Sequence, residues 1–544
     1  MSPKRVKREE LVQAPCQEAC PAGIDVPRYV RFIREGRFEE ALAVIREKIP
    51  FPAVCGFACY SPCESSCGKR QFGDPIAIRA LKRSAAELGG ELWKKALKVA
   101  PKTGKKVAIV GSGPSGLTAA YYLALLGHSV SVFEALPEPG GMMRYGIPSY
   151  RLPKDTLDAE ISYLKELGVE ILTNKKVESL EELQKQGFQA IYLALGAQKG
   201  AKLGVPGEDL PGVMDGIAFL RKVNGGELPH VGKRVAVIGG GNTAVDAARS
   251  ALRLGADEVT IFYRRSRAEM PAYEEEVGAA LAEGVGIEFL ASPVKIEARD
   301  GKLEVTFTKM QLGKPDSSGR ATPVPVKGSE FMREFDTLIA AVGQVPETPK
   351  GLGVDLTDGG FVKVDSETLS TGKPGVFAGG DLATGPKTII DAIAQGRKAA
   401  SSIDIFLGGK GIIDQELAPR EEEVIVVDYD TEGYGRVSLP CIPIEERRRS
   451  FASVEKALSE GMAIKEAARC LSCDARRFEV VVDAEGCKEC GYCVEVCGMG
   501  VFEPAPKFNK KGYRPFVPKK TERCVGCMLC FYACPDFSIE VKEA

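Results

Sequence analysis

The stretch KKVAIVGSGPSGLTAAYYLALLG, residues 105–127, decides the fold of the middle of the chain. A short apolar run is followed by a glycine-rich turn and then by an alanine-rich segment. This order predicts a strand, a turn and a helix, with G-x-G-x-x-G at the turn. The first glycine makes the turn, the second lets a pyrophosphate approach, and the third lets the helix pack on the strand. The helix N-terminus then favours anionic phosphates. The predicted dinucleotide-binding residues of this turn are Gly111, Gly113, Pro114, Ser115 and Gly116.

An acidic residue supports this assignment. Glu134 ends the next predicted strand, SVSVFE, at the spacing where a carboxylate accepts from ribose hydroxyls. A third element, GVFAGGDLATGPKTIIDAIAQG at 375–396, predicts a strand that ends at Gly380 and Asp381. Its carboxylate can accept from a flavin ribityl or ribose hydroxyl. The helix after it, near Thr388, can direct its N-terminus at the flavin.

A second strand–turn–helix unit begins with RVAVI at 234–238. Its turn reads GGGNTA, so the third glycine position holds alanine. The next strand, EVTIFY, is followed by Arg264 and Arg265, with Arg267 nearby. Arginines here can pair with a 2′-phosphate, which favours NADP(H) over NAD(H). The alternative is that they form a solvated surface and that the coenzyme is NAD(H). The predicted binding residues of this turn are Gly239, Gly241, Asn242, Thr243 and Ala244.

Sixteen of the seventeen cysteines fall into tight groups. An all-thiolate [4Fe–4S] cluster takes four cysteines, so the number fits four clusters that move single electrons. Cys441 is left over, as a buried or incidental thiol. The sixteen predicted ligands are Cys16, Cys20, Cys55, Cys59, Cys63, Cys67, Cys470, Cys473, Cys487, Cys490, Cys493, Cys497, Cys524, Cys527, Cys530 and Cys534.

Composition excludes several other classes of protein. The 544 residues are enough for about three or four domains, and 44% of them are apolar. The net charge of −1 gives no basic excess for nucleic acid. The start, MSPKRVKREE, has no apolar region after it, so we expect a solvated, frayed terminus and not a signal peptide. No run approaches the length of a membrane span. We therefore expect a cytoplasmic protein.

Two other uses of cysteine are alternatives to iron–sulfur clusters. Disulfides suit short secreted chains, which this is not. Zinc remains an alternative for a lone C-x2-C pair such as Cys470 and Cys473. With only two histidines, His128 and His230, histidine-rich metal sites and histidine acid–base chemistry are disfavoured. No nucleophile–base pair is evident, so the predicted chemistry belongs to cofactors.

The predicted fold is multidomain α/β, with an N-terminal α-helical iron–sulfur domain, two Rossmann-like domains and a C-terminal ferredoxin-like α+β domain. Residues 26–50 have helical spacing broken at Gly36, and alternation at 300–336 predicts antiparallel strands. Residues 408–450 read as an extended linker, followed by a helix within 452–473. The predicted segments are 1–100 (helical, with two clusters), 104–205 with 346–408 (FAD-binding), 206–345 (NAD(P)H-binding), 409–475 (linker and helix supplying cluster ligands) and 476–544 (ferredoxin).

Three segments, residues 111–155, 239–272 and 375–400, resemble the glutamate synthase small subunit. They are equally similar to the NADPH-binding halves of dihydropyrimidine dehydrogenase and of NADH-dependent ferredoxin:NADP oxidoreductase. The resemblance covers roughly residues 10–475. It implies FAD at the first turn and a nicotinamide coenzyme at the second. It also adds nucleotide-binding residues, namely Gly141, Met142, Arg144, Gly146, Ile147, Pro148, Arg151, Gly196 and Gly343.

The resemblance implies two N-terminal [4Fe–4S] clusters, but the arrangement of cysteines departs from the family pattern. An R-C-L-x-C pair usually precedes the other cysteines, whereas here it lies far downstream as Arg469 to Cys473. One cluster would then use Cys16, Cys67, Cys470 and Cys473. The second would use Cys20, Cys59 and Cys63. Its fourth ligand stays open, because the family's glutamine or glutamate position holds Lys82, and Cys55 is the substitute.

Residues 476–544 resemble a bacterial two-cluster ferredoxin, and more closely the ferredoxin-like subunit of 2-oxoacid:ferredoxin oxidoreductases. Each run reads C-x2-C-x2-C-x3-C. In such folds the fourth cysteine of each run ligates the other cluster. The second run ends in Cys534-Pro535. The first ends in Cys497-Gly498, and we expect the missing proline not to disturb ligation. The implied ligand sets are Cys487, Cys490, Cys493 with Cys534, and Cys524, Cys527, Cys530 with Cys497.

The predicted function is electron transfer between NADP(H), FAD, four clusters and a protein partner. The chain shows no site for a bulky substrate, so we expect a subunit of a hetero-oligomer, with 2-oxoacid oxidoreductase catalytic subunits or ferredoxin as the redox partner. One alternative is a stand-alone or bifurcating ferredoxin:NAD(P)⁺ reductase. Another is a glutamate synthase small subunit, and a third is a non-catalytic module with vestigial nucleotide sites.

Overall fold

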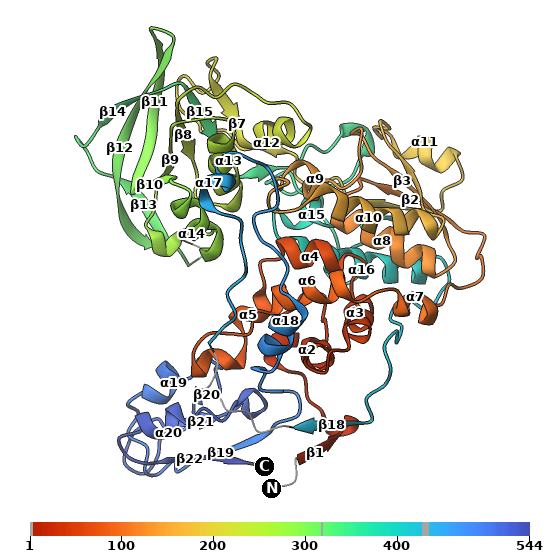
Figure 1. Ribbon diagram of the computed structural model, residues 1–544, viewed down its shortest axis with the longest axis vertical. Coiled ribbons are helices and arrows are strands. Elements are labelled where there is room, and N and C mark those ends of the chain that lie inside the picture. Colours follow the sequence, from red (N-terminus) through yellow and green to blue (C-terminus); the bar gives the residue numbers. More distant parts are fainter. Residues whose placement is uncertain (1–3, 317–318, 427–434) are drawn as a thin grey trace. The chain divides into compact units, whose positions relative to one another are not determined.

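The computed structural model describes residues 4–316, 319–426 and 435–544, and it divides into two compact units (Figure 1). Residues 98–413 with 440–456 form what we call the nucleotide-fold unit. Residues 1–97, 414–439 and 457–544 form the cysteine-rich unit. The elements confirm a multidomain α/β class. Among the described residues, no helix combines the length and apolarity needed to cross a membrane.

The first sheet of the nucleotide-fold unit is parallel and carries the turn at 111–116. Its strand order is β17-β5-β2-β3-β4. The central strand is buried along VAIV, because helices cover both faces of a doubly wound sheet. The elements are β2 (Lys106–Val110), α8 (Pro114–Leu125), β3 (Ser129–Phe133), α9 (Met142–Tyr145), α10 (Lys154–Glu166), β4 (Glu170–Leu172), α11 (Leu180–Lys185), β5 (Ala190–Leu193), β17 (Val376–Ala378), α15 (Asp381–Thr384) and α16 (Ile389–Phe406).

A second parallel sheet has the order β10-β9-β8-β15-β7. The antiparallel strands predicted at 300–336 are present, and they pack on this sheet through Phe262 and Phe307, whose rings stack at 4.2 Å. The elements are β6 (Lys199–Gly200), β7 (Val213–Asp215), α12 (Gly216–Asn224), β8 (Arg234–Ile238), α13 (Asn242–Arg253), β9 (Glu258–Tyr263), α14 (Glu274–Ala282), β10 (Gly286–Phe289), β11 (Ala291–Arg299), β12 (Lys302–Pro315), β13 (Ala321–Pro325), β14 (Phe331–Phe335), β15 (Thr337–Ala340) and β16 (Gln344–Val345).

The cysteine-rich unit begins with a strand, so the prediction of a frayed terminus is wrong for its described part. β1 (Lys4–Lys7) pairs antiparallel with β18 (Glu423–Val426). Val6 is buried against Val424, Val426 and Ala475, which gives this basic segment an apolar anchor. Helices follow, and the predicted break at Gly36 separates two of them. They are α1 (Pro15–Glu18), α2 (Val26–Arg34), α3 (Phe38–Arg46), α4 (Pro52–Ala58), α5 (Pro62–Ser65), α6 (Ile78–Leu88) and α7 (Leu92–Ala96).

The predicted linker and its helix are shorter and more structured than expected. The linker contains β18 and α17 (Ile444–Arg447), and its residues 427–434 lie outside the described residues. The helix expected within 452–473 is only α18 (Glu460–Ala467), capped by the Ser459 side chain. Upstream, the Val454 amide donates to the Tyr150 carbonyl at 2.9 Å, and an isolated bridge joins Cys441 and Glu455. These bonds fix the two ends of residues 441–455, with α17 between them.

The last part of the chain has the α+β arrangement predicted for a two-cluster ferredoxin. The outer strands pair antiparallel, and two short helices each contain the third cysteine of one run. The elements are β19 (Phe478–Val482), α19 (Tyr492–Val496), β20 (Phe502–Pro504), β21 (Phe516–Pro518), α20 (Leu529–Ala533) and β22 (Ile539–Glu543).

Candidate cofactor sites

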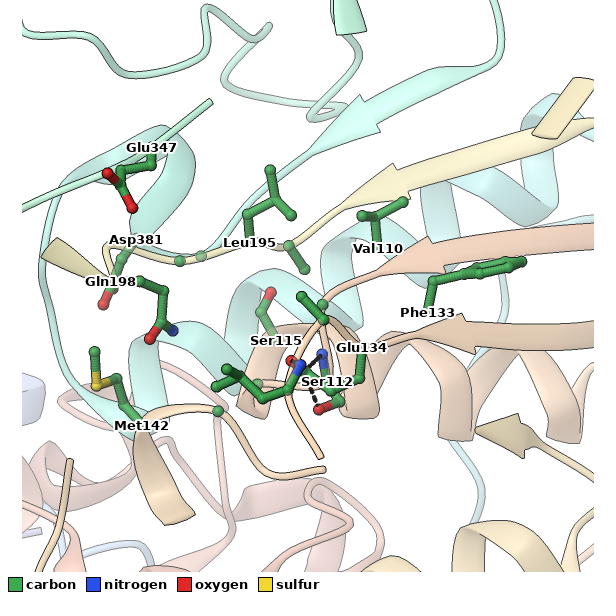
Figure 2. Close-up of a pocket in the computed structure, with 18 of the residues that line it drawn as sticks. Val110, Ser112, Ser115, Phe133, Glu134, Met142, Leu195, Gln198, Glu347 and Asp381 are labelled. Carbon is green, nitrogen blue, oxygen red and sulfur yellow. Dashed lines mark hydrogen bonds between the residues drawn. The ribbon is translucent and has the colours of Figure 1, made fainter. Parts of the chain in front are cut away.

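A cavity of about 770 Å³ lies at the carboxyl ends of β2, β3 and β5, as Figure 2 shows. Its wall includes the turn from Gly111 to Ser115. Gly111 has φ +106°, and a Cβ there would lie 2.4 Å from the Ala194 carbonyl oxygen. At Gly113 a Cβ would meet nothing within 4 Å, so the backbone is open toward a ligand. Gly116 would place a Cβ 2.1 Å from the Gly111 carbonyl oxygen, so helix α8 packs tightly on β2.

Glu134 lines the same cavity at the end of β3. One carboxylate oxygen accepts from the Ser112 amide at 3.0 Å and from the Ser112 hydroxyl at 2.5 Å. The other accepts from the Leu136 amide at 2.9 Å. Figure 2 draws the bonds between Ser112 and Glu134. The carboxylate is therefore fixed at the wall, where it can accept further hydrogen bonds from a ribose.

Asp381, shortly after the end of strand β17, also lines the cavity. Burial raises the pKa of its carboxyl to about 6, although the Lys387 amide donates to it at 3.0 Å. Thr388 caps α16 by accepting from the Asp391 amide at 3.3 Å. Thr388 and Lys387 also line the cavity, so the N-terminus of this 18-residue helix is directed at it. A half-buried carboxylate beside a helix N-terminus suits a hydroxyl-bearing, anionic ligand.

Some residues implied by the family resemblance lie elsewhere. The described lining includes Gly141, Met142, Gly196 and Gly380 but leaves out Arg144, Gly146, Ile147 and Arg151. Arg144 pairs with Asp158 and donates to the Pro139 carbonyl. Arg151 pairs with Asp246 at 2.7 Å and Glu276 at 2.8 Å. In this structure these two arginines bind protein carboxylates.

Other lining residues carry no signal in the sequence. Gln198 and Arg221 lie at the wall, and Arg221 donates to the Gln198 side-chain oxygen at 3.1 Å. Residues 175–178 and 347–351 also line the cavity. They come from loops with no motif. The volume lies within the range of cofactor pockets, and the glycine turn, the buried Glu134 and the half-buried Asp381 fit FAD. The residues that would hold it are those of the turn, Glu134 and Asp381.

The second turn, between β8 and α13, repeats the geometry of the first. Gly239 has φ +145°, and a Cβ there would lie 2.2 Å from the Ala341 carbonyl oxygen. A Cβ on Gly241 would meet nothing within 4 Å. The Asn242 side chain accepts from the Tyr273 amide at 3.1 Å, and Gln344, next to Gly343, donates to Thr243 at 3.3 Å. Ala244 is fully buried.

The three arginines after β9 differ from one another. Arg264 is exposed. Arg265 is buried and donates to the Asp316 carboxylate at 2.6 Å and to the Ala321 carbonyl at 2.8 Å. Arg267 pairs with the exposed Glu274 at 2.9 Å. Arg265 therefore fixes strand β13 in this structure, and Arg264 is the better placed of the pair to meet a 2′-phosphate.

Four thiols from both halves of the sequence line one small cavity in the cysteine-rich unit. They are Cys16, Cys67, Cys470 and Cys473. Burial raises the pKa of Cys16 strongly, and the charges of Cys473, Cys67 and Cys470 raise it further. The residue after Cys473, Asp474, forms a buried ion pair with Arg31 at 2.6 Å. Arg469 pairs at 2.6 Å with the fully buried Glu466, which also accepts from the Ala77 amide.

A second group of thiols surrounds a buried lysine. Burial by itself would lower the pKa of Lys82, but Cys59, Cys55, Cys63 and Cys20 together raise it above its ordinary value. Cys55 is fully buried on α4 and Lys82 is 3% exposed on α6. Both candidates for the fourth ligand therefore lie beside the other three thiols.

The C-terminal runs cross over. Cys524, Cys527 and Cys530 line one cavity together with Cys497 from the first run. Burial raises the pKa of Cys493 to about 11, and Cys487, Cys490 and Cys534 also raise it. Each group thus combines three thiols of one run with the last thiol of the other. Of the two expectations for Cys441, a buried or an incidental thiol, the first is wrong, because Cys441 is exposed.

Two of these groups each bring four thiols to one small cavity. An all-thiolate [4Fe–4S] cluster takes four cysteines, so each of these two sets has the ligands that such a cluster needs.

Comparison with known proteins gives matches along most of the chain. Residues 94–396 match the family described as pyridine nucleotide-disulphide oxidoreductase. Residues 10–91 match the 4Fe-4S cluster domain described as dihydropyrimidine dehydrogenase domain II, and residues 486–537 match the 4Fe-4S dicluster domain.

Three curated relatives share much of this sequence. The chain is 42% identical over 501 residues to the NADP(+)-dependent formate dehydrogenase subunit beta of Moorella thermoacetica, covering 85% of this chain and 71% of that one. It is 39% identical over 510 residues to the NADPH-Fe(3+) oxidoreductase subunit beta of Geobacter sulfurreducens, covering 85% and 75%. It is 34% identical over 413 residues to the glutamate synthase [NADPH] small chain of Escherichia coli, covering 71% and 87%.

Proposed function

The chain belongs to the pyridine nucleotide-disulphide oxidoreductase family, and on that premise we propose that it is the electron-transfer subunit of an NADP(H)-linked oxidoreductase. The family confirms the resemblance drawn from the three nucleotide-binding segments. The enzyme is an NAD(P)H-dependent FAD and iron–sulfur oxidoreductase. To this activity the proposal adds three specific claims: the chain holds four clusters, prefers NADPH to NADH, and works with a catalytic partner subunit.

One observation carries the proposal. A dinucleotide-sized cavity and two small thiol-lined cavities occur in the same chain. FAD supplies the conversion between a two-electron hydride and single electrons, and [4Fe–4S] clusters supply single-electron relay. A chain with both groups of sites suits electron exchange between a nicotinamide coenzyme and a protein.

The residues of the nucleotide-fold unit would bind FAD and the nicotinamide coenzyme and orient them. The open backbone at Gly113 and the α8 N-terminus would hold the FAD pyrophosphate. Glu134 and Asp381 would accept from ribose and ribityl hydroxyls. At the second turn, Gly241 leaves room for the coenzyme pyrophosphate, and Arg264 would pair with its 2′-phosphate.

The partner we propose is a subunit that carries the terminal substrate site. The two most similar relatives described above are each named as a subunit beta, and one is named for formate dehydrogenase. We therefore favour a dehydrogenase catalytic subunit of that kind over 2-oxoacid oxidoreductase subunits. The ferredoxin-like segment at 486–537 counts against a glutamate synthase small subunit, because that relative is matched over 71% of this chain only.

The test is purification of the native assembly, with identification of its other chains. Four clusters predict about sixteen irons per chain, with one FAD. NADPH should reduce a viologen dye faster than NADH does. Formate, and separately a 2-oxoacid, should be tried as the reductant of NADP⁺. A fully active single chain would refute the subunit proposal, and about eight irons would remove two clusters.

A further inference from the structure

Two cysteine-bearing loops of the cysteine-rich unit touch at Gly68. This residue follows Cys67 and begins a short 3₁₀ turn, residues 68–72. A Cβ on Gly68 would lie 2.6 Å from the Val525 side chain and 3.1 Å from Cys473 Sγ. Val525 lies directly after Cys524, in the C-terminal run. Cys473 packs against the same apolar cluster that contains Val525. Gly68 therefore lies against both Cys473, from the Cys16 group, and Val525, the neighbour of Cys524.

Gln71, on the same turn, reaches the second of these thiol groups. A Cβ on Gly498 would lie 2.3 Å from Gln71 Nε2, so the amide rests against the bare backbone of Gly498. Gly498 directly follows Cys497. The side-chain oxygen of Gln71 lies 4.0 Å from Cys527 Sγ. The amide is thus placed beside two of the four cysteines that line the cavity of the Cys524 group.

This contact explains a departure from the ferredoxin pattern. The second run ends in Cys534-Pro535, whereas the first ends in Cys497-Gly498. A Cβ at position 498 would come within 2.3 Å of the Gln71 nitrogen, so any side chain there would displace the amide from its present position. The glycine is what makes room for a residue from the N-terminal domain.

An ion pair holds the same two segments together. Arg523, directly before Cys524, pairs with Glu18 of α1, the helix that also carries Cys16. The loop of the second C-terminal run is therefore tied to the N-terminal domain at Glu18, Gly68 and Gln71. In contrast, Cys490 of the other C-terminal group is exposed, which suits exchange with an external partner.

We propose that the turn from Gly68 to Gln71 is the electron-transfer junction between the N-terminal and C-terminal iron–sulfur sites, and that Gln71 tunes the cluster of the Cys524 group. The inference rests on the proposed function, which supplies clusters and NADPH as the reductant. Clusters bound at the two sites would exchange single electrons, one gaining the electron that the other loses. The Gln71 side-chain oxygen faces Cys527 Sγ in the structure; a sulfur that binds a cluster is deprotonated and only accepts, so the amide would turn about its last side-chain bond and donate from Nε2 to that sulfur. Such a bond favours the more negative, reduced state and raises the reduction potential.

The test is a redox titration of the full chain with dithionite and mediators, in which electron paramagnetic resonance monitors the reduction of each cluster. The variant Gln71→Met removes the hydrogen-bond donor and keeps a side chain of similar size. The reduced-to-oxidised ratio of one cluster should fall about tenfold at fixed potential, which is a shift of about 59 mV. Gly498→Ala, which displaces the amide, should shift the same cluster. Gly461→Ala is the matched control, since its Cβ meets nothing within 4 Å.

A wild-type potential in Gln71→Met, with full iron content, would overturn the inference. If that variant loses iron, Gln71→Glu keeps the shape and replaces the donor by an acceptor, and a wild-type potential there would equally overturn it. Rapid mixing with NADPH should show slower reduction of the shifted cluster. Because dithionite bypasses NADPH and FAD, failure of NADPH to reduce wild type would refute the proposed function and leave the titration a valid test of Gln71.

Discussion

Glu283 is the centre of a buried charge network in the nucleotide-fold unit. Its side chain is fully buried and accepts from Arg249 at 2.7 and 3.0 Å and from Arg253 at 2.7 and 3.1 Å. Arg249 also pairs with Glu276, which in turn pairs with Arg151. The network connects α13, whose N-terminus is the second nucleotide turn, to the end of α14 and to residue 151. Replacing Glu283 by Gln should destabilise this whole region.

The magnitude follows from the pKa of Glu283. Burial would raise it, but the hydrogen bonds and charges of Arg249 and Arg253 outweigh burial and hold it at about 2, against an ordinary 4.5. A difference of that size corresponds to about 3 kcal/mol of stability. Because the pKa is depressed, this stability is present above about pH 4.5 and is lost as the pH falls toward 2. Glu283→Gln also leaves two buried guanidiniums facing a neutral amide, which agrees with about 3–5 kcal/mol for breaking a buried pair.

The assay is thermal unfolding of the FAD-loaded full chain at pH 7, monitored by the rise in flavin fluorescence as FAD is released. At roughly 2 °C or more per kcal/mol, Glu283→Gln should lower the midpoint by about 6 °C or more. Glu274→Gln, on the same helix, is the control, because its side chain is 90% exposed and its ion pair contributes less than about 1 kcal/mol. Equal midpoints for the two variants would show that the network contributes no net stability.

Four further changes test the cofactor sites. Gly111→Ala should give flavin-free protein, seen as loss of visible absorbance, since its Cβ would strike the Ala194 carbonyl; normal flavin content would refute the packing argument. Arg264→Ala should lower kcat/KM for NADPH about tenfold and leave NADH unchanged; equal losses would contradict a 2′-phosphate contact. Burial raises the pKa of Asp381 to about 6, so the affinity of the apoprotein for FAD should fall by up to tenfold per pH unit below 6. In Asp381→Asn that affinity should no longer depend on pH in this range. If the affinity of the wild-type protein is already independent of pH, this carboxylate does not bind FAD. Cys55→Ser should remove about four irons per chain, and full iron content would favour Lys82 or water at that position.

The parts of the fold predicted best are those fixed by local pattern. Strand–turn–helix periodicity located both nucleotide turns, because glycine is needed where a Cβ would strike the next strand. Alternation located the antiparallel strands β12 and β14. The frayed terminus was predicted wrongly because the pairing partner of β1 is β18, more than 400 residues away. Local charge gave no hint of it.

Side-chain roles at the sites were harder to predict than the positions of the turns. Arg264 and Arg265 are adjacent and look equivalent in the sequence, yet one is exposed and the other is bonded to Asp316. Arg151 lies in a segment implied to line the flavin, but carboxylates from α13 and α14 bind it instead. Both outcomes depend on partners brought in by tertiary packing, which no spacing rule contains.

Gly498, directly after Cys497, also shows that tertiary contacts cannot be predicted from a local motif. In the sequence it stands where the second run has Pro535, and we expect this difference not to disturb ligation. In the structure its bare backbone is in contact with Gln71, 427 positions upstream, and the same turn places Gly68 against Val525. A local motif defines which cysteines can hold a cluster, whereas the residues between two clusters are defined by how the domains pack. Departures from a motif are therefore where contacts between domains should be sought, and Gly498 is such a position.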